Sequence, residues 1–170
     1  ITLDSISDPG DDTISGYSLD WGDGVTETVP VSGSLSIGAG HPFTHTYADG
    51  TAVYTPTLVV SDEDGAHPVA VGAVTVLNVA PVIGTIPDQK VGLDDIFSFD
   101  ASFTDPGAEE YLTTVAWGDG TSDTTSAYSG TISTNNFYTA TGSYSVTITI
   151  NDGDGGVGQG SLIVDVVAPE

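Results

Sequence analysis

The chain has 170 residues, of which 24 are acidic and only Lys90 is basic, so its formal net charge is -23. This charge repels nucleic acids and anionic lipid headgroups and attracts cations, and the absence of cysteine excludes disulfides and thiol chemistry. Hydrophobic residues form 38% of the chain in short alternating runs, which argues against disorder, and no run approaches the roughly 20 residues that cross a bilayer.

Alternation of apolar and polar residues predicts strands, because a period of two puts one face on a core and the other in water. Tyr54–Val60 alternates but contains Pro56, which cannot donate to a ladder and predicts an edge, a bulge or an unpaired position. Further expected strands are Ala70–Val79, Ile96–Thr104, Tyr111–Trp117, Tyr144–Ile150 and Gly158–Val167. No helical apolar spacing with caps occurs, and short strands separated by frequent turns predict an all-β sandwich.

One series of motifs occurs twice. Trp21-Gly22-Asp23-Gly24 returns as Trp117-Gly118-Asp119-Gly120. Each copy follows an Asp-Pro-Gly turn and precedes a tyrosine-marked strand and an acidic loop. Such repetition indicates tandem modules. We place their boundary near Asn78–Pro81, which predicts domains 1–79 and 80–170 joined by a short, semi-rigid linker.

The two copies differ at their beginnings. Phe99–Gly107 matches Thr2–Gly10, but the preceding segment Val82–Phe97 has no counterpart in the first copy. We therefore expect the first module to lack its N-terminal strand. That strand lies upstream of this fragment, or another molecule donates it to the open sheet edge, as in donor-strand complementation.

The motifs resemble the polycystic-kidney-disease (PKD) domain. The resemblance rests on Trp-Gly-Asp-Gly, on the later Tyr138, Gly142 and Tyr144, and on the run Thr147–Gly155. Val82–Asp105 also resembles the start of cadherin-like modules in bacterial surface proteins. The resemblance implies two immunoglobulin-like β-sandwiches in a large extracellular or cell-surface protein. The composition, rich in Gly, Thr, Ser and Asp without Met, is typical of secreted bacterial or archaeal proteins.

The repeated Asp-Gly pairs predict hairpin turns, since glycine tolerates positive φ at little cost. We expect Trp21 and Trp117 to anchor the core beneath these turns, with sugar stacking as the alternative.

The acidic loops predict a metal site. In an immunoglobulin-like sandwich the B–C loop, the F–G loop and the start of strand A lie at one pole, and calcium takes six to eight oxygen ligands. We predict calcium at the entrance of the second module, near the junction, with candidate ligands Asn78, Asp105, Glu109, Glu110, Asp152 and Asp154. The corresponding first-module set is Asp8, Asp11, Asp12, Asp62 and Asp64. The alternative is a solvated acidic surface.

Nothing in the chain predicts catalysis. His41, His45 and His67 have no partners at zinc spacing and do not recur in the second copy, and the nucleophile-elbow pattern is absent. We predict a non-catalytic structural or adhesive module whose partners are neighbouring modules or other copies of itself. The alternatives are an accessory module of a secreted hydrolase that binds polysaccharide or cell-surface protein, and a filament subunit. Candidate sugar-stacking aromatics are Tyr17, Tyr111 and Tyr128.

Overall fold

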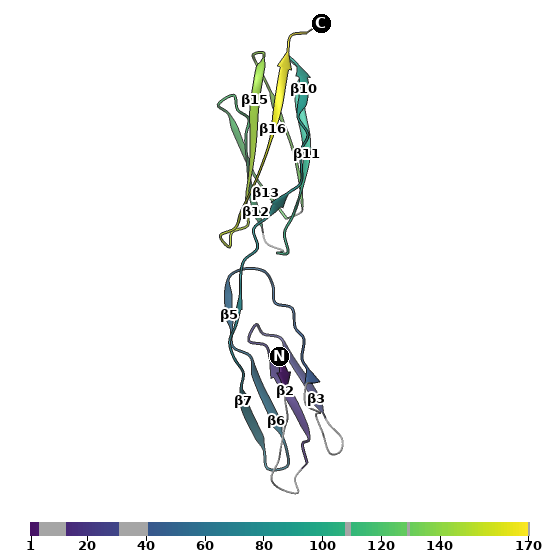
Figure 1. Ribbon diagram of the computed structural model, residues 1–170, viewed down its shortest axis with the longest axis vertical. Coiled ribbons are helices and arrows are strands. Elements are labelled where there is room, and N and C mark those ends of the chain that lie inside the picture. Colours follow the sequence, from purple (N-terminus) through teal and green to yellow (C-terminus); the bar gives the residue numbers. More distant parts are fainter. Residues whose placement is uncertain (4–12, 31–40, 108–109, 129, 170) are drawn as a thin grey trace. The chain divides into compact units, whose positions relative to one another are not determined.

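The computed structural model describes residues 1–3, 13–30, 41–107, 110–128 and 130–169. These residues form strands, turns and loops, and no helix among them could cross a membrane. The chain divides into two compact units, Ile1–Leu77 and Asn78–Glu170. Both are built from strands (Figure 1), as the alternating sequence predicts.

The first unit contains a four-stranded antiparallel sheet in the order β3-β2-β6-β7, together with the pairs β1-β4 and β5-β8 (Figure 1). Its strands are β1 (Thr2–Leu3), β2 (Gly16–Asp20), β3 (Thr26–Pro30), β4 (His41–Pro42), β5 (Ala52–Tyr54), β6 (Thr57–Ser61), β7 (Ala66–Ala70) and β8 (Val74–Val76). The described core consists of Ile14, Leu19, Trp21, Phe43, Leu58 and Val60.

Pro56 interrupts strand pairing in the first unit, as predicted. It lies buried between β5 and β6. Tyr54 pairs with Val74 and Thr57 pairs with Ala70, so the two residues 55–56 lie opposite the three residues 71–73. The partner strand therefore carries one extra residue, which is a bulge. The predicted continuous strand Ala70–Val79 is wrong for this reason, because only residues 74–76 resume pairing, as β8.

The second unit is a sandwich of two sheets (Figure 1). One has the order β10-β16-β15-β12-β13, with β10 parallel to β16, and the other has the order β14-β11-β9. The strands are β9 (Val82–Ile83), β10 (Gln89–Gly92), β11 (Ile96–Thr104), β12 (Tyr111–Ala116), β13 (Ser122–Ala127), β14 (Thr131–Phe137), β15 (Gly142–Asn151) and β16 (Val157–Val167). Among the described residues, the first unit has no counterpart of β9 or β10.

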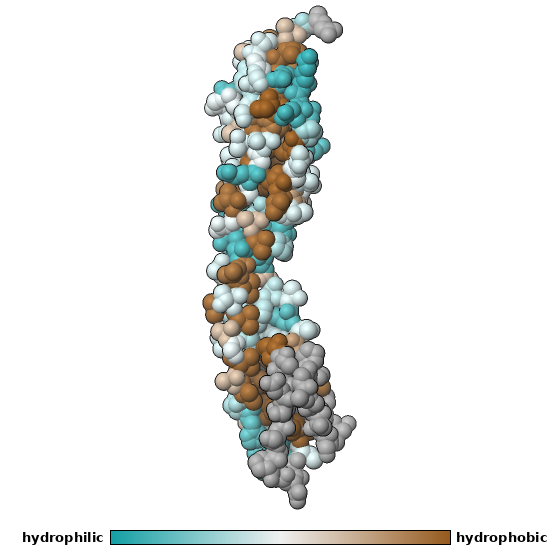
Figure 2. Space-filling model, viewed as in Figure 1, coloured by the Kyte–Doolittle hydropathy of each residue, from teal (hydrophilic) through white to brown (hydrophobic). Residues whose placement is uncertain are grey.

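Strict alternation builds the core of the second unit. In β11 the side chains of Phe97, Phe99, Ala101 and Phe103 are buried, and the residues between them are exposed. Val146, Ile148 and Ile150 of β15 and Leu162, Val164 and Val166 of β16 face them from the other sheet. Figure 2 shows the outside of this unit, in the upper part of the view, where apolar residues are interspersed among hydrophilic ones.

Three glycines of the second unit make room for its first residues. We call residues 78–83 the leading segment. A Cβ on Gly156 would overlap the Asn78 side chain and Ala80, and a Cβ on Gly158 would overlap the carbonyl of Pro81. A Cβ on Gly160 would lie 3.0 Å from the Ile83 side chain. Gly156, just before β16, and Gly158 and Gly160 within it therefore form the track along which the leading segment packs.

Candidate functional site

The Trp-Gly-Asp-Gly motif forms the same closed turn in both units. The backbone N–H of Trp21 donates to the carbonyl of Val25 at 2.9 Å, and that of Trp117 donates to Thr121 at 3.0 Å. All four glycines of the two motifs have φ between 79° and 94°, the left-handed region that favours glycine. Asp23 and Asp119 each accept a backbone N–H two residues ahead. The predicted turn role of these aspartates is confirmed.

Each tryptophan is held inside the core by a tyrosine that follows a later strand, outside the strand itself. Tyr47 donates to the Trp21 carbonyl at 3.0 Å, and Tyr138 donates to the Trp117 carbonyl at 3.1 Å. Burial raises the pKa of both tyrosine hydroxyls. Trp21 and Trp117 are only 2% and 1% exposed, so they anchor the core as predicted and offer no surface to a sugar.

The turn aspartate has a different partner in each unit. His45 Nε2 lies 2.7 Å from Asp23 Oδ2 in the first, whereas Asn136 Nδ2 donates to Asp119 Oδ2 at 2.9 Å in the second. The His45 ring also stacks on Trp21, with ring centroids 4.8 Å apart. The hydrogen bond with His45 is the main reason that the pKa of Asp23 lies below its ordinary value. His45 therefore has a structural role beside the turn of the first unit.

Asp152 closes the acidic loop of the second unit and is only 1% exposed. Its Oδ1 accepts the backbone N–H groups of Asp154 and Gly156 at 2.9 and 2.8 Å, and its Oδ2 accepts Nδ2 of Asn78 at 2.9 Å. Burial raises the pKa of Asp152, but the hydrogen bonds from Asn78 and the loop backbone outweigh it and hold the pKa below its ordinary value. The leading segment is thereby fastened to the loop after β15.

Asp62 closes the corresponding loop of the first unit with another partner. Its Oδ1 accepts from the backbone of Asp64 and Gly65, and its Oδ2 lies 2.8 Å from Nε2 of His67. Burial raises the pKa of Asp62, and the hydrogen bonds from His67 and the loop backbone more than reverse this effect. A histidine of β7 thus makes the contact that Asn78 makes in the second unit.

Asp105 follows β11, whose last residues Phe103 and Thr104 pair with Ile83 and Val82 of the leading segment. Its Oδ1 accepts the N–H of Gly107 at 2.8 Å and lies 3.4 Å from the hydroxyl of Tyr111. Its Oδ2 is buried and has no hydrogen-bond partner among the described residues. The same is true of Asn78 Oδ1 and Thr113 Oγ1. Buried oxygens without partners are costly and rare, so each requires an explanation.

The predicted calcium ligands are only partly brought together. Asn78 and Asp152 are in contact, Asp105 belongs to the same end of the unit, and Glu110 and Asp154 are exposed there. No three His, Cys, Asp or Glu side chains of the described chain form a metal-binding group. Asp8, Asp11, Asp12 and Glu109 lie outside the described residues. Nothing in the sequence distinguishes Thr113, which carries the third buried oxygen without a partner, from any other strand threonine.

The three aromatic candidates for sugar stacking differ in their exposure to solvent. Tyr111 is 4% exposed and packs edge-on against Phe103, so it cannot serve as a surface platform. Tyr17 is half-buried against Phe43. Tyr128 alone of the three is well exposed, at 73%.

The sequence model of the PKD domain matches residues 78–166, more than half of the chain. No curated protein matches the chain. Among solved structures, an I-band fragment of titin is 12% identical with a TM-score of 0.43, over 90% of this chain and 55% of the fragment. The chain thus spans about half of that fragment's length.

Two further structures are similar at the same level. Domains 4 and 5 of the S-layer protein SbsC are 15% identical with a TM-score of 0.40, over 92% of this chain and 100% of theirs. A fragment of mouse cadherin-23 is 15% identical with a TM-score of 0.38, over 90% of this chain and 53% of its own. The family model covers the second unit, and because it matches more than half of the chain, the chain belongs to the PKD-domain family.

Proposed function

We propose that the chain is a non-catalytic structural or adhesive part of a larger extracellular or cell-surface protein, and that calcium stiffens it at the entrance of the second module. The structural role is supported by the way each module uses its motif residues. The two tryptophans, their partners Tyr47 and Tyr138, and the turn aspartates hold cores and turns together. Family and fold are those of non-catalytic modules.

The calcium proposal rests on one observation, the two buried oxygens without partners on Asn78, which begins the second unit, and on Asp105, which follows the strand β11 that pairs with the leading segment. Asn78 Oδ1 is an amide oxygen and Asp105 Oδ2 is a carboxylate oxygen, and both are donor types that calcium prefers. Asp152 would contribute its carboxylate, and the exposed Asp154 and Glu110 could complete the shell. The ion would neutralise a strongly acidic pole and hold the leading segment against the loop after β15.

The first module is a weaker candidate. His67 occupies Asp62 Oδ2 there, so the carboxylate has a partner that competes with a cation when the histidine is protonated. We therefore expect calcium to act first on the second module.

Thermal unfolding of the whole chain in calcium and in chelator, at fixed ionic strength, tests the proposal. A bound ion stabilises the folded state by mass action, so the midpoint of the second module should rise with calcium. Asn78→Ala should abolish the rise. Asp165→Asn, which removes the charge of one exposed side chain on β16, should preserve it. A midpoint that is equal in calcium and magnesium, or equally raised in both variants, would reduce the effect to screening of surface charge.

A further inference from the structure

One surface of the second module differs from an ordinary solvated sheet. We call the outward residues of β11 and β14 the β11–β14 face. They form four cross-strand pairs, which are Ile96 with Phe137, Ser98 with Asn135, Asp100 with Ser133, and Ser102 with Thr131. All eight side chains are exposed, since the residues between them fill the core or are half-buried. Along the strands the four pairs span about 20 Å.

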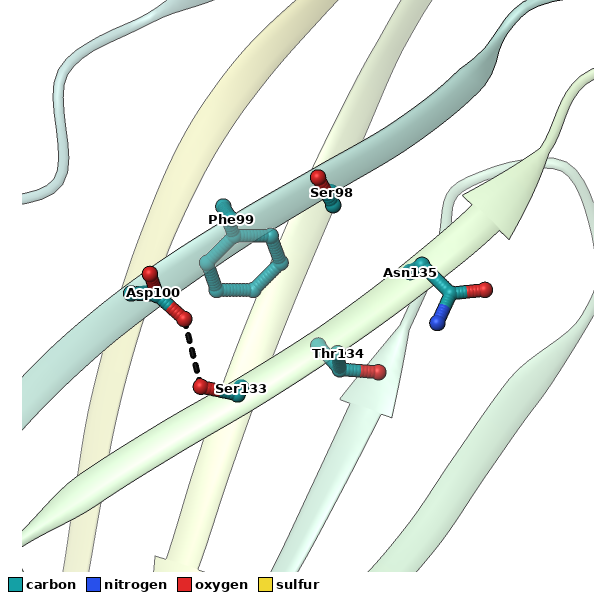
Figure 3. Close-up of a pocket in the computed structure, with 6 residues that line it drawn as sticks. All are labelled: Ser98, Phe99, Asp100, Ser133, Thr134 and Asn135. Atoms are coloured by element: carbon teal, nitrogen blue, oxygen red, sulfur yellow. Dashed lines mark hydrogen bonds between the residues drawn. The ribbon is translucent and has the colours of Figure 1, made fainter.

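The middle of this face is hollowed and polar. A hollow of about 360 Å³ is lined by Ser98, Asp100, Ser133, Thr134 and Asn135, with Phe99 forming its floor. Figure 3 shows the serine, aspartate and asparagine side chains lying along the two adjacent strands, with Asp100 and Ser133 joined by a hydrogen bond. The hydroxyls and the amide both donate and accept, and the carboxylate accepts. Two neighbouring pairs therefore present mixed hydrogen-bonding groups within one shallow depression.

One end of the same face is apolar. Ile96 is 71% exposed and its cross-strand partner Phe137 is 48% exposed. No other outward pair between these strands is apolar. An exposed aromatic ring next to a short row of hydrogen-bonding side chains is the composition of a ligand site, in which apolar surface gives affinity and a few polar groups give orientation.

We propose that the β11–β14 face binds a neutral glycan. A sugar ring has an apolar face of C–H groups, which suits Phe137, and a rim of hydroxyls, which suits Asn135, Ser98 and Asp100. The length of the face fits a short run of sugar rings rather than a single one. The charge of -23 and the carboxylate of Asp100 exclude acidic polysaccharides by repulsion.

A neutral glycan accounts for this face better than a protein partner does. The apolar area is limited to one pair of side chains, whereas a stable protein interface has an apolar core surrounded by a polar rim. The site shares no residue with the calcium candidates, so the glycan proposal goes beyond the structural role and holds with or without a bound ion.

The test uses the whole chain and a panel of immobilised polysaccharides: cellulose, chitin, a mixed-linkage β-glucan, mannan and, as the acidic control, alginate. We expect retention on at least one neutral polymer and none on alginate, without dependence on calcium. Phe137→Ala and Asn135→Ala should each weaken that binding by about tenfold, a difference of about 1.4 kcal/mol. Leu112→Ala and Ser145→Ala, which remove exposed side chains from the other sheet, should leave it unchanged.

Two outcomes would overturn the proposal. One is retention on no neutral polymer, and the other is equal binding by Phe137→Ala and wild type. Circular dichroism of each variant separates a lost contact from a lost fold. Because these substitutions do not touch the calcium candidates, failure here leaves the calcium-dependent shift in midpoint intact, and the two proposals can fail separately.

Discussion

Asn78 donates a hydrogen bond of 2.9 Å to Asp152, a residue 74 positions later in the chain. This contact joins the first residue of the second unit to the loop between its last two strands. It is possible because Gly156 has no side chain where the two residues meet. The contact between Asn78 and Asp152 thus depends on Gly156, and together they fix the leading segment to the acidic loop.

The glycine track gives the first prediction. Gly158→Ala places a Cβ against the backbone carbonyl of Pro81, which cannot move as freely as a side-chain tip. We expect a loss of about 1–3 kcal/mol in the free energy of unfolding of the second unit, as for other overpacked sites. Denaturant unfolding measures it, with Gln159→Ala, an exposed neighbour, as the control. Equal stability of the two variants would show that the leading segment does not need this track.

The Tyr–Trp contact gives the second prediction. Tyr138→Phe removes the donor to the Trp117 carbonyl inside the core, at 1% exposure. The carbonyl then loses its partner, and we expect a cost of about 1–3 kcal/mol in the free energy of unfolding. Tyr128→Phe, at an exposed position of the same unit, should change the unfolding curve by less than about 0.5 kcal/mol. If both substitutions have the same effect, the hydrogen bond contributes nothing specific.

The third prediction concerns the aspartate of the Trp-Gly-Asp-Gly turn, which contacts His45 in the first unit and Asn136 in the second. The hydrogen bond with His45 lowers the pKa of Asp23 in the folded chain. The sign follows by linkage: the ionised carboxylate stabilises the fold above the pKa of the unfolded state, and this stabilisation is lost as the pH falls through the lower folded pKa. His45→Ala should therefore raise the pKa of Asp23.

Carboxyl-carbon NMR of the whole chain checks this prediction. The titration midpoint of Asp23 should move up in His45→Ala, while that of Asp119, which Thr121 and Asn136 hold, stays in place. Asn136→Ala is the matched reciprocal variant and should move Asp119 alone. A midpoint of Asp23 that is unchanged without His45 contradicts the assigned cause.

The sequence predicted the fold most closely where alternation is strict. The bounds of β11 agree residue for residue with the expected strand, because Phe97, Phe99 and Phe103 fall on alternate positions with nothing to interrupt them. Pro56 was equally informative as an interruption. By contrast, β10 has four residues, Gln89–Gly92, and pairs in parallel with a strand more than 70 positions away. So short a run carries no periodicity, and only the tertiary structure reveals it.

The sequence indicated one end of the second module as the candidate site, but it did not indicate which side-chain atoms lack partners. In the structure Asn78 contacts Asp152, and Asp105 follows the end of β11 that pairs with the leading segment. Which oxygens lack partners depends on side-chain rotamers and on loop turns, and these are set by contacts between distant segments. The contact of His45 with Asp23 was missed for the same reason, since a loop and a turn 22 positions apart must first be brought together.

The central claim, that calcium fastens the leading segment to the loop after β15, is tested most directly at Asn78 itself. In a calcium titration of the whole chain, the side-chain amide NMR signal of Asn78 should shift and saturate, because the ion recruits its unpaired oxygen. Asp105→Asn should weaken the saturation, and magnesium at equal ionic strength should not reproduce it. An Asn78 signal that stays unchanged through millimolar calcium would contradict the account and leave the acidic pole as a solvated surface.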